Sequence, residues 1–122
     1  MRRSLWLLAA LLAVATAARA QEGRQAHMEG CLIWSNSGAV AVRNECSRLI
    51  VLQFMTVEDQ RIVTADLPPG GRFTSEAQWG QTSGFLFTAC PAGYRPNVRF
   101  AAENKDAIGL SLYYCIGGRP NS

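Results

Sequence analysis

Four cysteines constrain this chain of 122 residues more than any other feature, because they lie far apart in a short sequence: Cys31, Cys46, Cys90 and Cys115. Structural zinc sites usually take their ligands in close pairs such as Cys-x-x-Cys, and redox-active dithiols use the same spacing. No two of these cysteines are closer than fifteen positions. The sequence therefore predicts no metal site and no cofactor. An even number of cysteines in a small chain is instead typical of disulfides formed in an oxidising compartment.

The first twenty residues point to such a compartment. Residues 1–3 read Met-Arg-Arg, residues 5–18 are almost entirely apolar, and residues 18–20 read Ala-Arg-Ala, with small residues where a signal peptidase cleaves. The apolar stretch covers about fourteen residues, whereas a membrane-spanning helix needs about twenty. We expect residues 1–20 to be a cleavable signal peptide, with no membrane span after cleavage. The protein is then periplasmic or secreted.

The charge balance argues against a nucleic-acid partner. The chain has 12 basic and 9 acidic residues, but three of the basic ones lie in the first twenty positions, where no acidic residue occurs. Beyond that segment the two signs balance. Binding to nucleic acid needs an excess of Lys and Arg gathered on one face, so we expect no nucleic-acid binding.

Local sequence favours one of the three possible disulfide pairings. A short apolar run follows Cys31, a polar turn follows at Asn36 to Gly38, and an alternating run then leads to Cys46. If the chain reverses at that turn, these two cysteines meet at the open end of a hairpin. We therefore predict Cys31–Cys46 and, by remainder, Cys90–Cys115. Each closed loop is expected to contribute about 3 kcal/mol.

Apolar residues recur with a period of two through most of the remaining chain, which is typical of strands. Residues 48–57 and 61–67 predict a hairpin, and the first of these runs is apolar on both faces, as in a central strand. The Pro-Pro-Gly-Gly sequence at 68–71 predicts a chain reversal. Further strands are expected at 72–74, 84–90, 98–101 and 108–115. Only residues 75–78 and 101–107 leave room for a helical turn.

These elements predict an all-β fold, a small antiparallel β-sandwich or barrel of six to eight short strands stapled by disulfides. No repeat or linker divides the chain. We expect a flexible N-terminal segment at 21–30, one β-domain at 31–116 and a flexible tail at 117–122.

Three short motifs carry a resemblance to known proteins. Val42-x-Asn44-x-Cys46 is followed by Leu67-x-Pro69-Gly70 and later by Cys90-Pro91-x-Gly93-Tyr94. The pattern resembles small secreted bacterial β-sandwich proteins of unassigned function and, loosely, the thaumatin-like and crystallin-like groups. The resemblance implies a β-sandwich and assigns no functional residue.

The sequence offers no obvious catalytic set. The only histidine, His27, precedes the first predicted strand, so no Ser-His-Asp arrangement can form within the folded part, and no Gly-x-Ser-x-Gly turn occurs. An enzyme working with two carboxylates alone remains the least favoured alternative. Its candidate acids fall in expected turns or connections, for example Glu58, Asp59, Glu103 and Asp106.

Binding through loops is the more economical hypothesis. The long connections at 75–83 and 91–97 contain Trp79, and Tyr94 with Arg95, which are residue types enriched in binding hot spots. We predict a non-enzymatic domain that binds a protein or glycan partner, a macromolecule or envelope component, through these three residues. A structural role for Trp79, as a cover over one open end of the core, competes with this. A small secreted inhibitor of a hydrolase is the alternative function.

Overall fold

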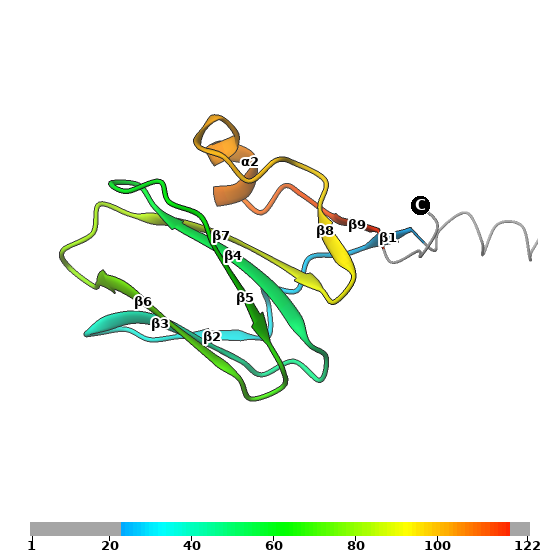
Figure 1. Ribbon diagram of the computed structural model, residues 1–122, viewed down its shortest axis with the longest axis horizontal. Coiled ribbons are helices and arrows are strands. Elements are labelled where there is room, and N and C mark those ends of the chain that lie inside the picture. Colours follow the sequence, from blue (N-terminus) through cyan, green and yellow to red (C-terminus); the bar gives the residue numbers. More distant parts are fainter. Residues whose placement is uncertain (1–22, 118–122) are drawn as a thin grey trace, which may run out of the picture.

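A computed structural model describes residues 23–117, which form nine strands and two short helical segments (Figure 1). The expected signal peptide and residues 118–122 lie outside the described residues. The strands are β1 (Arg24–Gln25), β2 (Leu32–Trp34), β3 (Ala39–Asn44), β4 (Ile50–Thr56), β5 (Val63–Leu67), β6 (Arg72–Gln78), β7 (Phe85–Pro91), β8 (Tyr94–Pro96) and β9 (Cys115–Gly117). A 3-10 helix, η1 (Ala102–Asn104), leads directly into α2 (Lys105–Gly109).

Two antiparallel three-stranded sheets pack face to face (Figure 1). Their strand orders are β5-β4-β7 and β2-β3-β6. Leu32 and Val42 from one sheet meet Ile50, Leu52 and Ala89 from the other in a single buried cluster. The predicted all-β, disulfide-containing fold is therefore confirmed.

β4 is the central strand, and both of its faces are covered. Ile50, Leu52 and Phe54 point into the sandwich, while Met55 points the other way and packs with Ile108 of α2. β4 pairs with β5 from Ile50 opposite Leu67 to Phe54 opposite Val63. The hairpin predicted over residues 48–67 is confirmed. Both faces of β4 are apolar because one packs inside the sandwich and the other packs against α2.

A third sheet, in the order β1-β9-β8, joins the two ends of the described chain. Arg24 pairs with Ile116, and the Met28 N–H donates to the Ala89 carbonyl at 2.9 Å. Residues 24, 25 and 28, within the segment expected to be flexible at 21–30, are thus hydrogen-bonded to β9 and β7. Their partners lie some sixty to ninety positions away along the chain, so the local sequence does not predict these contacts.

Both predicted disulfides are present. Cys31–Cys46 closes the open end of the β2–β3 hairpin, with the Cα atoms 5.1 Å apart. Cys90–Cys115 joins β7 to β9, with the Cα atoms 5.8 Å apart.

Asn44, whose side chain is fully buried, lies between the Cys31–Cys46 disulfide and the β4–β5 hairpin. Its amide group donates to the carbonyls of Arg48 and Leu67, and its oxygen accepts the Cys46 N–H, so one side chain fixes three segments.

The predicted strand at 108–115 is wrong. The chain is helical to Gly109 and closes with the Leu112 N–H donating to the Ala107 carbonyl, an arrangement that places Ser111 at a φ of 56°. Leu112 is 70% exposed, whereas Tyr113 and Cys115 are buried. The buried side chains of this segment are therefore those of Tyr113 and the disulfide-bonded Cys115. The alternating aliphatic residues do not determine which face lies inward.

Two further expectations fail near loops. Residues 98–101 form no strand, because Phe100 packs with Met55 and Ile108 beside the helix, and the strand of this region is β8. Residues 75–78 form no helical turn, because β6 continues to Gln78. The helical turns expected at 101–107 are present as η1 and α2.

Candidate binding cleft

Aromatic side chains fill the end of the sandwich away from the disulfides. The Trp34 ring lies 4.6 Å from Phe87 and 5.1 Å from Phe85, and Phe54 lies 5.4 Å from Phe73, measured between centroids. These residues come from four strands, β2, β4, β6 and β7, in both sheets. They form a continuous aromatic layer. A ligand that enters from the side of the sandwich can reach no deeper than this layer.

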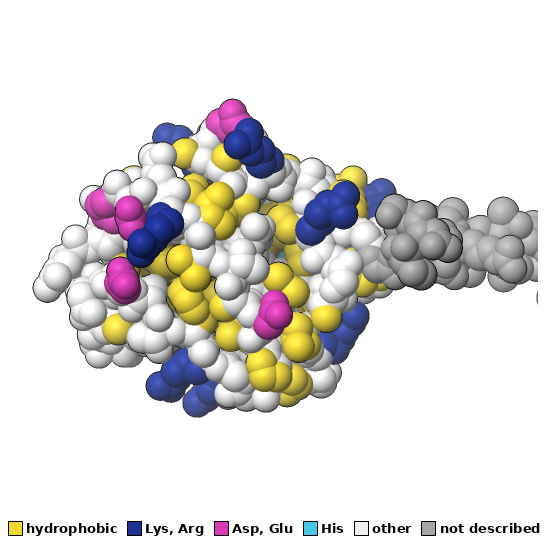
Figure 2. Space-filling model, in the orientation of Figure 1, with side chains coloured by type: hydrophobic (Ala, Val, Ile, Leu, Met, Phe, Trp, Pro, Cys, Tyr) yellow, Lys and Arg dark blue, Asp and Glu magenta, His cyan; other side chains and the backbone are white. Residues whose placement is uncertain are grey.

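A cleft of about 490 Å³ opens over this layer between β6 and the β4–β5 hairpin. Phe54 and Phe73 lie at its base, and Val63 lines one side. The turns after β4 and after β6 contribute polar residues, including Arg61 and Thr82. Figure 2 shows hydrophobic atoms exposed on this face between β5 and β6, with acidic and basic side chains beside them.

The cleft exists because the inward side chains of β6 are small. β6 alternates exposed and partly buried residues along its whole length, and the inward positions after Phe73 are Ser75 and Ala77. Facing sheets pack about 10 Å apart, a space that large side chains normally fill. With a hydroxymethyl and a methyl group at these positions, the space beside Phe54 stays open.

Charged groups on the rim give the mouth of the cleft an acidic character. The Arg61 guanidinium lies 3.4 Å from Glu76 and 3.9 Å from Asp59. Glu58 accepts hydrogen bonds from the Ser83 backbone N–H and from the Thr82 hydroxyl. The Ser83 backbone hydrogen bond is the main cause that lowers the pKa of Glu58 below its ordinary value. Three carboxylates and one guanidinium therefore line the cleft, and this excess of negative charge favours a cationic ligand.

Trp79 braces the cleft from outside. Its indole Nε1–H donates to the Ser35 hydroxyl at 2.8 Å, and its ring meets Phe85 edge-on at 5.6 Å. Phe85 in turn stacks on Phe54, the base of the cleft, at 5.3 Å. Trp79 is partly buried and is not among the lining residues. Its contacts are those of a cover on the aromatic layer, while its neighbours Gln78, Gln81 and Thr82 line the cleft itself.

The other two predicted binding residues lie elsewhere. Tyr94 and Arg95 belong to β8 in the small third sheet, at the opposite end of the molecule from the turn that carries Trp79 (Figure 1). Arg95 is exposed and Tyr94 is partly buried. The structure therefore does not bring the three residues into one surface, and their role in binding stays a prediction.

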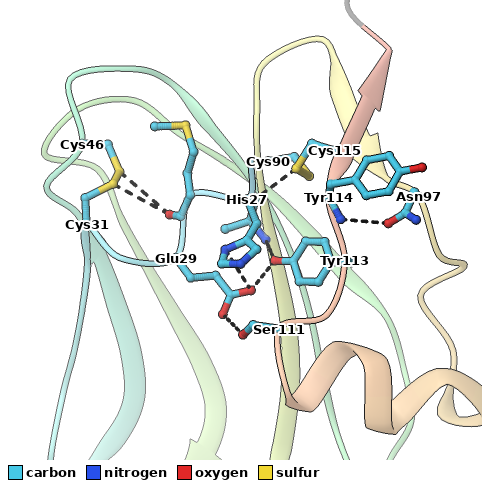
Figure 3. Close-up of polar contacts among 12 residues, drawn as sticks. His27, Glu29, Cys31, Cys46, Cys90, Asn97, Ser111, Tyr113, Tyr114 and Cys115 are labelled. Atoms are coloured by element: carbon cyan, nitrogen blue, oxygen red, sulfur yellow. Dashed lines mark hydrogen bonds and ion pairs between the residues drawn. A yellow bond between two sulfur atoms is a disulfide. The ribbon is translucent and has the colours of Figure 1, made fainter. Parts of the chain in front are cut away.

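A second polar cluster surrounds Glu29, and sequence analysis missed it. The Ser111 hydroxyl donates to Glu29 at 2.8 Å, and the Tyr113 hydroxyl donates to the same carboxylate while accepting the Ala89 N–H (Figure 3). The His27 ring packs on Tyr113 with centroids 5.1 Å apart. Burial and the hydrogen bond to Glu29 raise the pKa of Tyr113 well above its ordinary value.

The geometry of this cluster suits anchoring. The Ser111 hydroxyl is bonded to the carboxylate and not to the imidazole, whose Nδ1 lies 3.7 Å from Glu29 and has no hydrogen-bond partner in the described chain. A serine nucleophile needs a base within hydrogen-bond reach. The contacts tie residues 27–29 to a segment more than eighty positions away, and no sequence motif marks that pairing.

Two other kinds of site are not found in residues 23–117. No group of three or more His, Cys, Asp or Glu side chains there is placed to hold a metal ion. Nor does this part of the chain contain a helix long and apolar enough to cross a membrane. Comparison of the chain with family models, curated proteins and solved structures finds no match.

Proposed function

We propose that this chain is an exported, non-enzymatic binding domain, and that its ligand enters the cleft between β6 and the β4–β5 hairpin. The cleft is the main observation that supports a binding role. Its volume of about 490 Å³ lies within the range of ligand sites, and such sites combine an apolar base with a few polar groups on the rim. The two disulfides support export, because such bonds persist in oxidising compartments, here the periplasm or the exterior of the cell.

The charges of the rim specify the ligand further. Glu58, Asp59 and Glu76 outnumber Arg61, and Phe54 and Phe73 offer aromatic contact below them. A group that is apolar at its tip and positively charged behind it satisfies both features. The ligand is then a cationic, apolar group carried by a macromolecule or an envelope component.

Three small probes that share one benzyl group test this proposal by NMR titration: phenethylammonium, phenethyl alcohol and phenylpropionate. We expect the cation to shift the amide signals of β6 and of Phe54, the neutral probe to do so more weakly, and the anion to do so least. Ala77→Phe fills the cleft and should abolish the shifts. Thr64→Phe adds the same ring at an exposed β5 position outside the cleft and should leave them unchanged. Equal binding of cation and anion, or binding that Ala77→Phe does not affect, would refute the proposal.

A further inference from the structure

One wall of the cleft is the edge of β6 and not merely one of its faces. Six consecutive residues, 73–78, line the cavity. Successive side chains of a strand point to opposite faces, so a surface that contacts only one face would touch every second residue. Contact with all six means that the cavity runs along the backbone of β6. At about 3.4 Å per residue this wall is roughly 17 Å long, the length of a five- or six-residue extended peptide.

Within residues 23–117, no strand pairs with the edge of β6 that faces away from β3. β6 is the outermost strand of the order β2-β3-β6 within the described chain. The Gly71 carbonyl accepts the Asn44 N–H from the β3 side. Because successive residues of an antiparallel strand direct their backbone groups to alternate sides, Arg72 and Thr74 direct theirs away from β3. These N–H and C=O groups are available to an added strand.

The other lip of the cleft is less suited to pairing. β5 has only five residues and runs into Pro68 and Pro69, which have no backbone donor. β6 has seven residues and contains no proline. A partner strand therefore has its longer and better template on β6.

The side chains beside this edge define a complementary sequence. On the inner face, Ser75 and Ala77 are small and Phe54 lies behind them, so inward side chains of an added strand must be large and apolar. On the outer face Glu76 has a side chain that is 93% exposed, and its carboxylate lies 3.4 Å from the Arg61 guanidinium. A basic residue at an outward position of the added strand would face this carboxylate, a favourable cross-strand pair.

From these features we infer that the partner is an extended polypeptide segment which adds to β6 as a further strand, with apolar side chains alternating with a basic one. The inference rests on the proposed function, because it uses the same cleft, and it specifies the class of ligand. Main-chain hydrogen bonds to β6 supply affinity, and the cleft selects the inward side chains.

Backbone methylation of a peptide tests the inference. The probe is acetyl-Thr-Val-Lys-Phe-Thr-Val-amide, in which Val, Phe and Val share one face and Lys lies on the other. Two derivatives carry N-methyl groups, one on the second and fourth residues and the other on the third and fifth. Dissociation constants come from isothermal titration calorimetry, and amide shifts of the protein locate the contact. Light scattering at the same concentrations reports the oligomeric state.

Only one of the two methylated peptides blocks the edge that faces β6. We expect that peptide to bind roughly tenfold more weakly than the parent, from the loss of two hydrogen bonds, and the other to bind like the parent. Ala77→Phe should abolish binding, and Thr64→Phe should not affect it.

Two results would overturn strand addition while leaving the cleft as a binding site: equal affinity of both methylated peptides and the parent, or no binding of the parent while phenethylammonium still shifts the cleft signals. A dimer whose dissociation on dilution perturbs the β6 amides would make a second copy the occupant, and would also overturn the inference. Failure of the phenethylammonium titration as well would refute the proposed function itself.

Discussion

Asn44→Ala should destabilise the fold strongly, because it leaves buried backbone groups without hydrogen-bond partners. The Asn44 side chain is completely buried and makes three hydrogen bonds, to the carbonyls of Arg48 and Leu67 and to the Cys46 N–H, at 2.7–2.8 Å. Alanine removes the side-chain partner and leaves these backbone groups in place. A buried backbone group without a partner costs about 1–3 kcal/mol. The bonds to Leu67 and Cys46 are fully buried, so we expect a loss of about 3–4 kcal/mol.

The assay is urea unfolding with both disulfides intact, followed by near-UV circular dichroism. For a domain of this size, such a loss lowers Tm by more than about 10 °C. Asn44→Asp keeps the shape and the acceptor but loses both donated bonds, so it should destabilise the fold as well. Asn36→Ala, in the exposed turn of the β2–β3 hairpin, is the matched control and should change stability by less than about 0.5 kcal/mol. A value for Asn44→Ala within about 1 kcal/mol of the unaltered protein would show that these buried hydrogen bonds do not stabilise the fold as expected.

Three smaller predictions use the same unfolding assay. Replacing Cys31 and Cys46 together by Ala opens a loop of 15 residues and should cost about 3 kcal/mol, and a loss below about 1 kcal/mol would contradict the expected role of that disulfide. Ser111→Ala should destabilise more than Ser111→Gly, because both lose the bond to Glu29 but only Gly adopts a φ of 56° without strain; the reverse order would be inconsistent with this turn. The folded-state pKa of Glu58 is lowered, so its contribution is present above its ordinary pKa of 4.5 and is lost as the pH falls through the folded-state value. Glu58→Gln should therefore flatten the acid limb of the stability profile, and an unchanged limb would contradict that contribution.

The parts of the fold that depend on neighbouring residues were predictable. A turn at residues 36–38 between two alternating runs is enough to bring Cys31 beside Cys46, and the second disulfide then follows by remainder. The hairpin of β4 and β5 follows from residues 48–67, because a polar turn separates two β-rich runs. Gly70, at a φ of 80°, supplies the reversal expected after Leu67. In each case the partners lie within about twenty-five residues of each other.

The errors concern residues whose surroundings come from distant parts of the chain. The alternation of Ile108, Leu110 and Leu112 predicts a strand, yet Leu110 and Leu112 are exposed because the buried side chains of this region are Tyr113 and Cys115. Their burial depends on Ala89 and Cys90 in β7. Glu29 appears in the sequence as part of a polar end, whereas in the fold its carboxylate is bonded to Ser111 and Tyr113.

The cleft could not be predicted from the sequence for a related reason. Ser75 and Ala77 look like loop or helix residues locally, and their small size matters only because Phe54 lies behind them in another sheet. Trp79 is an isolated aromatic residue among Gly and Gln, a pattern that predicts a binding residue. In the fold it contacts Ser35 and Phe85 and so supports the base of the cleft. A hollow is a property of two strands together, so a pattern along one strand does not reveal it.

Intermolecular nuclear Overhauser effects measure the occupancy of the cleft directly. With phenethylammonium bound, we expect contacts from its benzyl protons to the Ala77 methyl group, to the Val63 methyl groups and to the rings of Phe54 and Phe73, all of which line the cleft. The methylene next to the ammonium group should lie nearer to Glu76. Contacts confined instead to Tyr94 and the third sheet, or to Trp79 without Ala77, would contradict the assignment of the binding site.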